Sequence, residues 1–101
     1  MIVVLVEVES SAAAIEEMRE ALIVMTKASR AEEGCHQYAF SQDIANPDCL
    51  RVVEVWESMD ALKFHFGTDH MAAFQQALAG SPPRSMTVKV HELGAELALP
   101  S

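Results

Sequence analysis

Basic residues are scarce in this sequence. Its 101 residues include 7 Lys and Arg against 15 Asp and Glu, which gives a formal net charge of −8. A phosphate backbone repels such a surface, so we expect no nucleic-acid partner. Long apolar runs are missing too, since none reaches the roughly 18 residues that a membrane span needs. The apolar N-terminal stretch also lacks the basic residues that precede a secretory signal. We therefore expect a soluble cytoplasmic protein with no membrane partner.

Cysteine is represented only by Cys35 and Cys49, and the sequence has no C-x-x-C pair. In the hairpin predicted below the two residues lie near opposite ends, beyond the roughly 7 Å between Cα atoms that a disulfide allows. We expect both thiols to be reduced and structural. Glycine-rich phosphate loops and nucleophile elbows are also absent, which leaves nucleotide binding and serine hydrolysis without support.

The apolar periodicity of the chain predicts strands and helices in a definite order. Strands are expected over residues 2–9, 35–42, 50–57 and 85–93, and helices over 11–33, 58–66 and 68–79. This is the order β-α-β-β-α-β, with the second helix broken in two, and it predicts an α+β, ferredoxin-like sandwich. We expect one domain over residues 1–93 and a C-terminal tail over 94–101 without a fold of its own.

The two strands that this fold places at the centre of its sheet are the first and the third. Both are apolar on both faces, whereas the second and fourth carry the polar residues expected of edge strands. Helices can cover only one face of such a sheet. We therefore predict a homodimer packed through the other face, with a monomer of unusually apolar surface as the alternative.

Glu54 is the first candidate for chemistry, because it shares a strand face with Val52 and Trp56. A carboxylate on an apolar face costs free energy unless it is hydrogen-bonded, and its pKa rises in a dry pocket. Two structural roles remain open at this point. Glu54 would otherwise pair with Arg51 or Lys89, or lie at the edge of the dimer interface.

His65 is the second candidate, on the inward face of the predicted short helix, as a proton acceptor or a hydrogen-bond donor. A buried histidine that caps the helix is the alternative. His70, in the first turn of the next helix, is a weaker candidate. A metal site built from His65, His70 and Glu54 lacks the i, i+4 spacing of one helix face, so we predict no metal. Tyr38 joins this pocket only if the hairpin register places it on the face of Glu54.

Several short motifs follow one another along the chain. EEGCHQY occupies residues 32–38 after the long helix, and E-V-W-E-S occupies residues 54–58. Ala61-Leu62, His65, His70 and Phe74 continue the series. In order and spacing the sequence resembles the antibiotic biosynthesis monooxygenase family, in its quinol-monooxygenase-like branch.

This resemblance implies a dimeric α/β barrel with a pocket between sheet and helices in each subunit. It also implies oxidation of a quinol-, anthrone- or phenol-type small molecule with dioxygen, without metal, flavin or haem. The protein would need only to deprotonate, orient and dry an electron-rich substrate. By position, the catalytic residues would be His65, the first choice as proton acceptor, and Glu54, and the substrate-binding residues Tyr38, Trp56, His70 and Phe74.

Two other functions remain open, because a shared fold does not decide the reaction. One is a cofactor-free isomerase of a small carbonyl compound. The other is a non-catalytic dimer that binds a small aromatic molecule. The sequence names no substrate and no assembly beyond the dimer.

Overall fold

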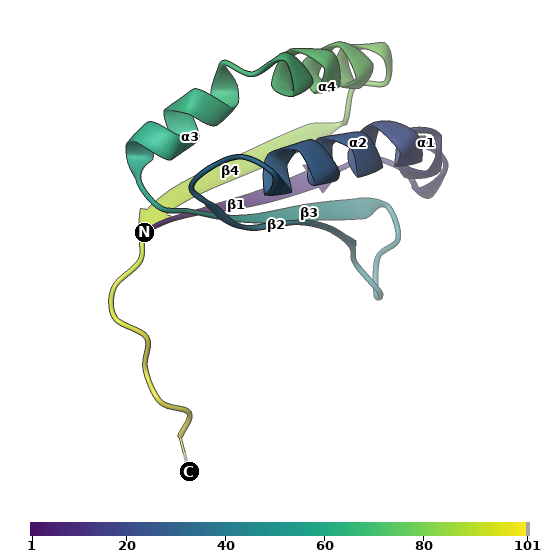
Figure 1. Cartoon of the computed structure of the whole chain (residues 1–101). Helices are drawn as coiled ribbons and strands as arrows, with labels where there is room; N and C mark the ends of the chain where they lie inside the picture. Colours follow the sequence, from purple (N-terminus) through teal and green to yellow (C-terminus); the bar gives the residue numbers. More distant parts are fainter. Residues whose placement is uncertain (101) are drawn as a thin grey trace.

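Four strands form one antiparallel sheet, and the helices lie together on one of its faces (Figure 1). The computed structural model describes residues 1–100. The elements in chain order are β1 (Ile2–Glu9), α1 (Ala12–Glu17), α2 (Arg19–Arg30), β2 (Cys35–Gln42), β3 (Cys49–Trp56), α3 (Met59–Phe66), α4 (Asp69–Gly80) and β4 (Ser85–Glu92). Residues 94–100, in the predicted tail, form neither helix nor strand.

The strand order is β2-β3-β1-β4, which places the two most apolar strands at the centre of the sheet. This confirms the predicted α+β, ferredoxin-like fold. The pairing of β2 with β3 sets Tyr38 directly opposite Glu54, and the pairing of β1 with β3 sets Val4 opposite Glu54. Residues opposite each other share a face of the sheet. The register that the sequence left open therefore brings Tyr38 and Glu54 together.

The long helix predicted over residues 11–33 is wrong in two places. It is interrupted at Met18, whose N–H lies 3.1 Å from the carbonyl oxygen of Ala14 and 3.2 Å from that of Ile15. It also ends at Arg30, and residues 31–34 form a turn before β2. The apolar stripe runs through the interruption, because side-chain periodicity does not report a local change of backbone hydrogen bonding.

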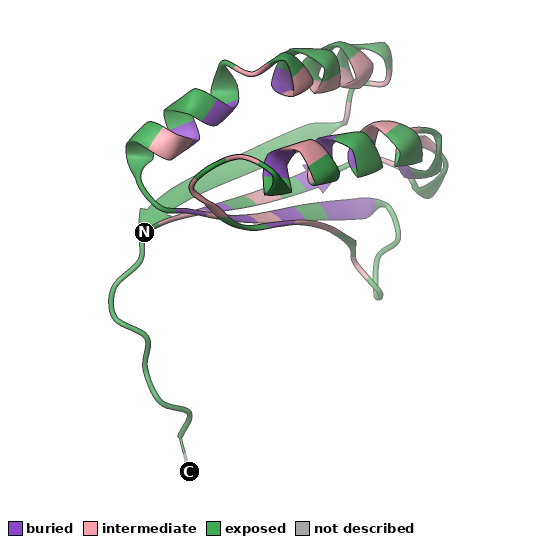
Figure 2. Cartoon of the chain, viewed as in Figure 1, coloured by how far each residue is buried: buried purple, intermediate pink, exposed green. Residues whose placement is uncertain are grey.

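The core lies between the central strands and the sheet-facing sides of the helices (Figure 2). One buried cluster contains Val4, Met25, Tyr38, Val52, Trp56, Leu62 and Met71, and a second contains Val8, Ile15, Leu22 and Leu50.

Strand β4 is exposed along its whole length, including Met86, Val88 and Val90. The sequence predicted a half-exposed strand. Both cysteines are free thiols, as expected.

Gly34 closes the turn between α2 and β2, where a side chain has no room. Its φ is +85°, and a Cβ there would lie 2.8 Å from the Cβ of Ala61 at the start of α3. Its carbonyl oxygen accepts a 2.7 Å hydrogen bond from the N–H of Glu57. Glycine thus permits both the positive φ and the close approach of the turn to α3.

We predict that Gly34→Ala destabilises the fold. The left-handed backbone alone costs about 1–2 kcal/mol for a residue with a Cβ, and the contact with Ala61 adds to this. The matched control is Gly80→Ala, because a Cβ at Gly80 meets no atom within 4 Å. Urea unfolding of the two variants checks the prediction. Equal stabilities for both would contradict it.

Candidate functional site

Glu54 lies on the helix-facing side of the central strand β3, and its side chain is 9% exposed. The indole N–H of Trp56 donates a 2.9 Å hydrogen bond to Oε1 of Glu54. Burial raises the pKa of this carboxyl, while the hydrogen bond from Trp56 and the charge of His65 act in the opposite direction. Arg51 pairs with Asp43 and Glu7 instead. The alternative in which Glu54 pairs with Arg51 is therefore wrong.

A cavity of about 150 Å³ opens beside Glu54, between the sheet and helices α1 and α4. Its walls are mainly apolar and include Val4, Val6, Val8, Phe40, Leu50, Val52, Met71, Phe74, Leu78, Met86 and Val88. Among the described lining residues, Glu54 is the carboxylate and Tyr38 the phenol. Burial, with a smaller contribution from the charge of Glu54, raises the pKa of Tyr38. The cavity thus presents one proton-accepting group against apolar walls.

His65 lies behind Glu54 and does not line this cavity. The imidazole is fully buried and stacks at a tilt on Trp56, with ring centroids 4.6 Å apart. Its Nε2 atom is 3.9 Å from Oε1 of Glu54, and its Nδ1 atom is 2.5 Å from Oε2 of Glu32. The histidine therefore meets the cavity indirectly, through Glu54 and through the rings of Tyr38 and Phe66, whose centroids lie 5.6 Å and 5.8 Å from its own.

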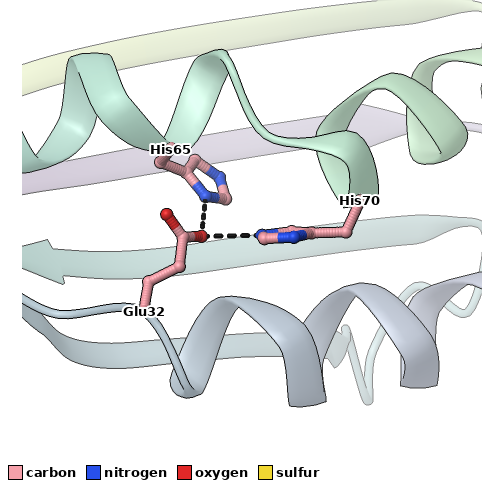
Figure 3. A group of neighbouring side chains, drawn as sticks. All are labelled: Glu32, His65 and His70. Atoms are coloured by element: carbon pink, nitrogen blue, oxygen red, sulfur yellow. Dashed lines mark hydrogen bonds and ion pairs between the residues drawn. The ribbon is translucent and has the colours of Figure 1, made fainter.

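Glu32 joins both candidate histidines (Figure 3). Its Oε2 atom is 2.7 Å from Nε2 of His70 as well as 2.5 Å from Nδ1 of His65. No local sequence pattern marks Glu32 as a site residue, because its partners lie 33 and 38 positions further along the chain. The available signal was an acidic residue two positions before Gly34, in the turn motif that carries the family resemblance.

Thr68 sets the angle between the two short helices that carry the histidines. Its hydroxyl donates a 2.7 Å hydrogen bond to the carbonyl oxygen of His65 and accepts one from the N–H of Met71. The same side chain therefore bonds to the last turn of α3 and caps α4. This break lets the imidazoles of His65 and His70 approach each other, with ring centroids 5.8 Å apart.

The six predicted site residues fall into two groups. Tyr38, Glu54 and Phe74 line the cavity, whereas Trp56, His65 and His70 lie outside its lining. The second group is linked to the first through the contacts of Glu54 with Trp56 and His65.

Comparison with known proteins gives the family. A sequence profile described as antibiotic biosynthesis monooxygenase matches residues 1–77. The chain belongs to this family. The protein named "Probable quinol monooxygenase YgiN" from Escherichia coli (strain K12) is 40% identical over 57 residues, which are 48% of this chain and 55% of YgiN. The chain thus spans about half the length of the curated relatives it matches.

Solved structures of family members and other bacterial proteins share the fold. A family member from Deinococcus radiodurans superimposes with a TM-score of 0.90 at 22% identity, covering 100% of both chains. Rv0793 from Mycobacterium tuberculosis gives 0.83 at 24% identity, covering 96% of this chain and 98% of that one. Within residues 1–100, no helix combines the length and the apolar character that crossing a membrane requires.

We predict that the raised pKa of Glu54 makes the protein lose stability as pH rises. A carboxyl whose pKa is higher in the folded state binds its proton more tightly there, so it favours folding below its ordinary value of 4.5. This contribution is lost as pH rises through the folded-state pKa. Glu54→Gln removes it, so the variant gains stability relative to the wild type as pH rises. Urea unfolding below and above this pH range measures the difference, and a constant difference would contradict the prediction.

Proposed function

We propose that this protein is a cofactor-independent monooxygenase that oxidises a quinol-, anthrone- or phenol-type small molecule with dioxygen. The observation that carries the proposal is the placement of Glu54, a carboxylate in the wall of an apolar cavity between sheet and helices. Family membership and the similarity to YgiN support the same reaction class. The predicted cytoplasmic location stays a prediction.

In the proposed reaction Glu54 accepts the phenolic proton of the substrate. The resulting phenolate is electron-rich and reduces dioxygen directly, so the chemistry requires no protein-bound redox group. For a quinol, one oxygen atom enters the ring and the other leaves as water, which gives a hydroxyquinone. A raised pKa suits Glu54 to this role, because a carboxylate of higher pKa is a stronger base. The apolar walls keep water from the reactive intermediates.

This assignment shifts the first proton acceptor from His65 to Glu54. His65 lies behind Glu54, with its Nε2 atom 3.9 Å from the carboxylate and outside the cavity lining. We propose that His65 positions Glu54 and that its charge limits the rise in the pKa of the Glu54 carboxyl. We also propose that Tyr38 and Phe74 contact the substrate from within the cavity. Trp56 would hold the Glu54 carboxylate through its N–H. His70 would act indirectly, through its contact with Glu32.

The cavity favours a small substrate. Its volume of about 150 Å³ equals that of an engineered apolar cavity that admits benzene. A one-ring quinol therefore fits within it, whereas a three-ring anthrone would extend past Met86 and Val88 on the exposed strand β4. We expect the fastest turnover with one- and two-ring quinols.

We predict that protein freed of metal and flavin consumes dioxygen with quinols, and that Glu54→Gln lowers the rate about 10²–10⁴-fold. The matched control is Glu57→Gln. It makes the same chemical change at an exposed residue outside the cavity, in contact with His36. Oxygen-electrode rates over a panel of quinols, phenols and anthrones provide the measurement, with circular dichroism to establish folding.

The outcomes of this assay separate the three functions left open by the sequence. Turnover of a carbonyl compound without oxygen uptake would favour the isomerase. Ligand binding without turnover would favour the binding protein. Oxygen uptake that Glu54→Gln leaves unchanged would keep the activity and remove the proposed role of Glu54.

We further propose that two copies of the chain pack through the open face of the sheet. The helices cover the other face, and Val3, Leu5, Val53 and Val55 on the central strands point away from them. Leu5 is 43% exposed although it lies on a central strand. An apolar strip of this kind favours a partner that covers it.

We predict that Leu5→Glu converts the dimer to a monomer, because it places a carboxylate in the middle of this strip. The matched control is Ile44→Glu, which makes the same change at a fully exposed loop residue. Sedimentation equilibrium measures the mass of each variant. A wild-type chain that sediments as a monomer would contradict the proposed assembly.

A further inference from the structure

Three residues from separate parts of the chain bring metal-binding atoms together (Figure 3). None of the three lines the cavity. Glu32 comes from the turn after α2, His65 from α3 and His70 from α4. One ligand atom from each lies within 4.8 Å of the other two. Two imidazole nitrogens and a carboxylate oxygen are a ligand set that divalent transition metals use in proteins. We call these residues the Glu32–His65–His70 cluster.

The hydrogen bonds within the cluster leave two buried polar atoms unused. Oε1 of Glu32 and Nε2 of His65 have no hydrogen-bond partner among residues 1–100, and their side chains are 6% and 1% exposed. Buried polar atoms without a partner are rare in folded proteins and point to an additional interaction. A cation bound to both oxygens of Glu32 would satisfy the first of these atoms.

Glu54 lies on the side of the His65 ring where a metal-binding histidine often has a carboxylate. A histidine that ligates a metal through one ring nitrogen usually donates the N–H of the other to a carboxylate. Nδ1 of His65 faces Glu32, and its Nε2 faces Oε1 of Glu54 at 3.9 Å. With a metal on Nδ1, the proton resides on Nε2 and points to Glu54, which Trp56 already holds. At 3.9 Å this is an electrostatic contact between His65 and Glu54 and not a hydrogen bond.

The charges around the cluster also favour a cation. Glu32 and Glu54 are two carboxylates under the same helices, and the ion pairs that the described residues make with them involve histidine alone. A divalent ion would offset the cost of burying both. His70, with a side chain 20% exposed, connects the cluster to solvent.

We propose that Glu32, His65 and His70 form a binding site for a first-row divalent transition metal, for which Zn²⁺ is the natural probe. Nitrogen donors select such ions over Mg²⁺ and Ca²⁺, which prefer oxygen. The three ligands do not line the cavity, so the ion sits behind Glu54 and does not touch the substrate. Its role is to fix the turn, α3 and α4 together and to orient His65 toward Glu54. The proposed oxidation needs no metal, so metal binding can be tested separately from it.

The test measures metal binding to the chelator-treated full chain, without substrate and without a histidine tag. Calorimetry with Zn²⁺ is expected to show one ion per chain, and Co²⁺ to give the visible absorption of a nitrogen- and oxygen-ligated site. Because the ion binds only the folded state, the unfolding temperature should rise with Zn²⁺ concentration. Mg²⁺ should produce none of these changes.

Variants separate this site from adventitious binding. His70→Gln and Glu32→Gln should abolish the Co²⁺ absorption and the rise in unfolding temperature, and Glu54→Gln should weaken Zn²⁺ binding by about 10–100-fold. The double variant His36→Gln/His91→Gln removes the other two of the chain's four histidines and should bind like the wild type. His70 is the preferred ligand to replace because it is partly exposed, and circular dichroism would establish that the variant folds.

Two results would overturn the inference. One is an absence of Zn²⁺ binding to the folded wild type, which would leave the cluster as a hydrogen-bonded network alone. The other is binding that survives in His70→Gln and disappears in His36→Gln/His91→Gln, which would place the ion on the surface. Neither result bears on oxygen uptake, which is measured on metal-free protein, so the two proposals fail separately.

Discussion

Glu32 meets two histidines that follow it by 33 and 38 residues, and this shared carboxylate ties the turn after α2 to both short helices. The contact with His65 is buried, so water competes little with it, whereas the His70 side chain is 20% exposed. Their geometry decides which ring nitrogen of His65 faces Glu32 and which faces Glu54. Glu54 in turn is the carboxylate that reaches the cavity. The pKa of Glu54 therefore depends in part on Glu32, a turn residue that does not line the cavity.

The position of this turn depends on chain geometry as much as on charge. Gly34 allows the chain to reverse after Glu32 with its backbone close to Ala61 at the start of α3. Thr68 fixes the angle at which α4 leaves α3. A change at either position would move an imidazole relative to Glu32 without altering any charged group. The turn at Gly34 and the helix break at Thr68 thus position the ionisable side chains in this part of the fold.

The fold was predictable from the sequence because strand composition and element order agree, and the central placement of β1 and β3 follows from their apolar residues. The site was predictable only in part. Glu54 and His65 were visible as polar residues on apolar faces, whereas Glu32 lies in a turn, where no periodicity marks it. The placement of Tyr38 depended on the register between β2 and β3, since a slip of one residue would have turned its side chain away from Glu54. Pairings across more than 30 residues are set by tertiary structure, which local patterns do not encode.

Strand β4 forms a wall of the cavity that is open to solvent. Met86 and Val88 line it and yet are 44% and 53% exposed, because the helices leave this edge strand uncovered. Apolar surface of this kind gains about 25 cal/mol for each Å² that a ligand removes from water. A flat aromatic ring bound beside Glu54 would therefore be held in part by β4 and would itself exclude water from the carboxylate. In the proposed oxidation, a substrate would complete the dry environment that the reaction requires, and the residues of β4, more than those around Glu54, would set which ring systems bind.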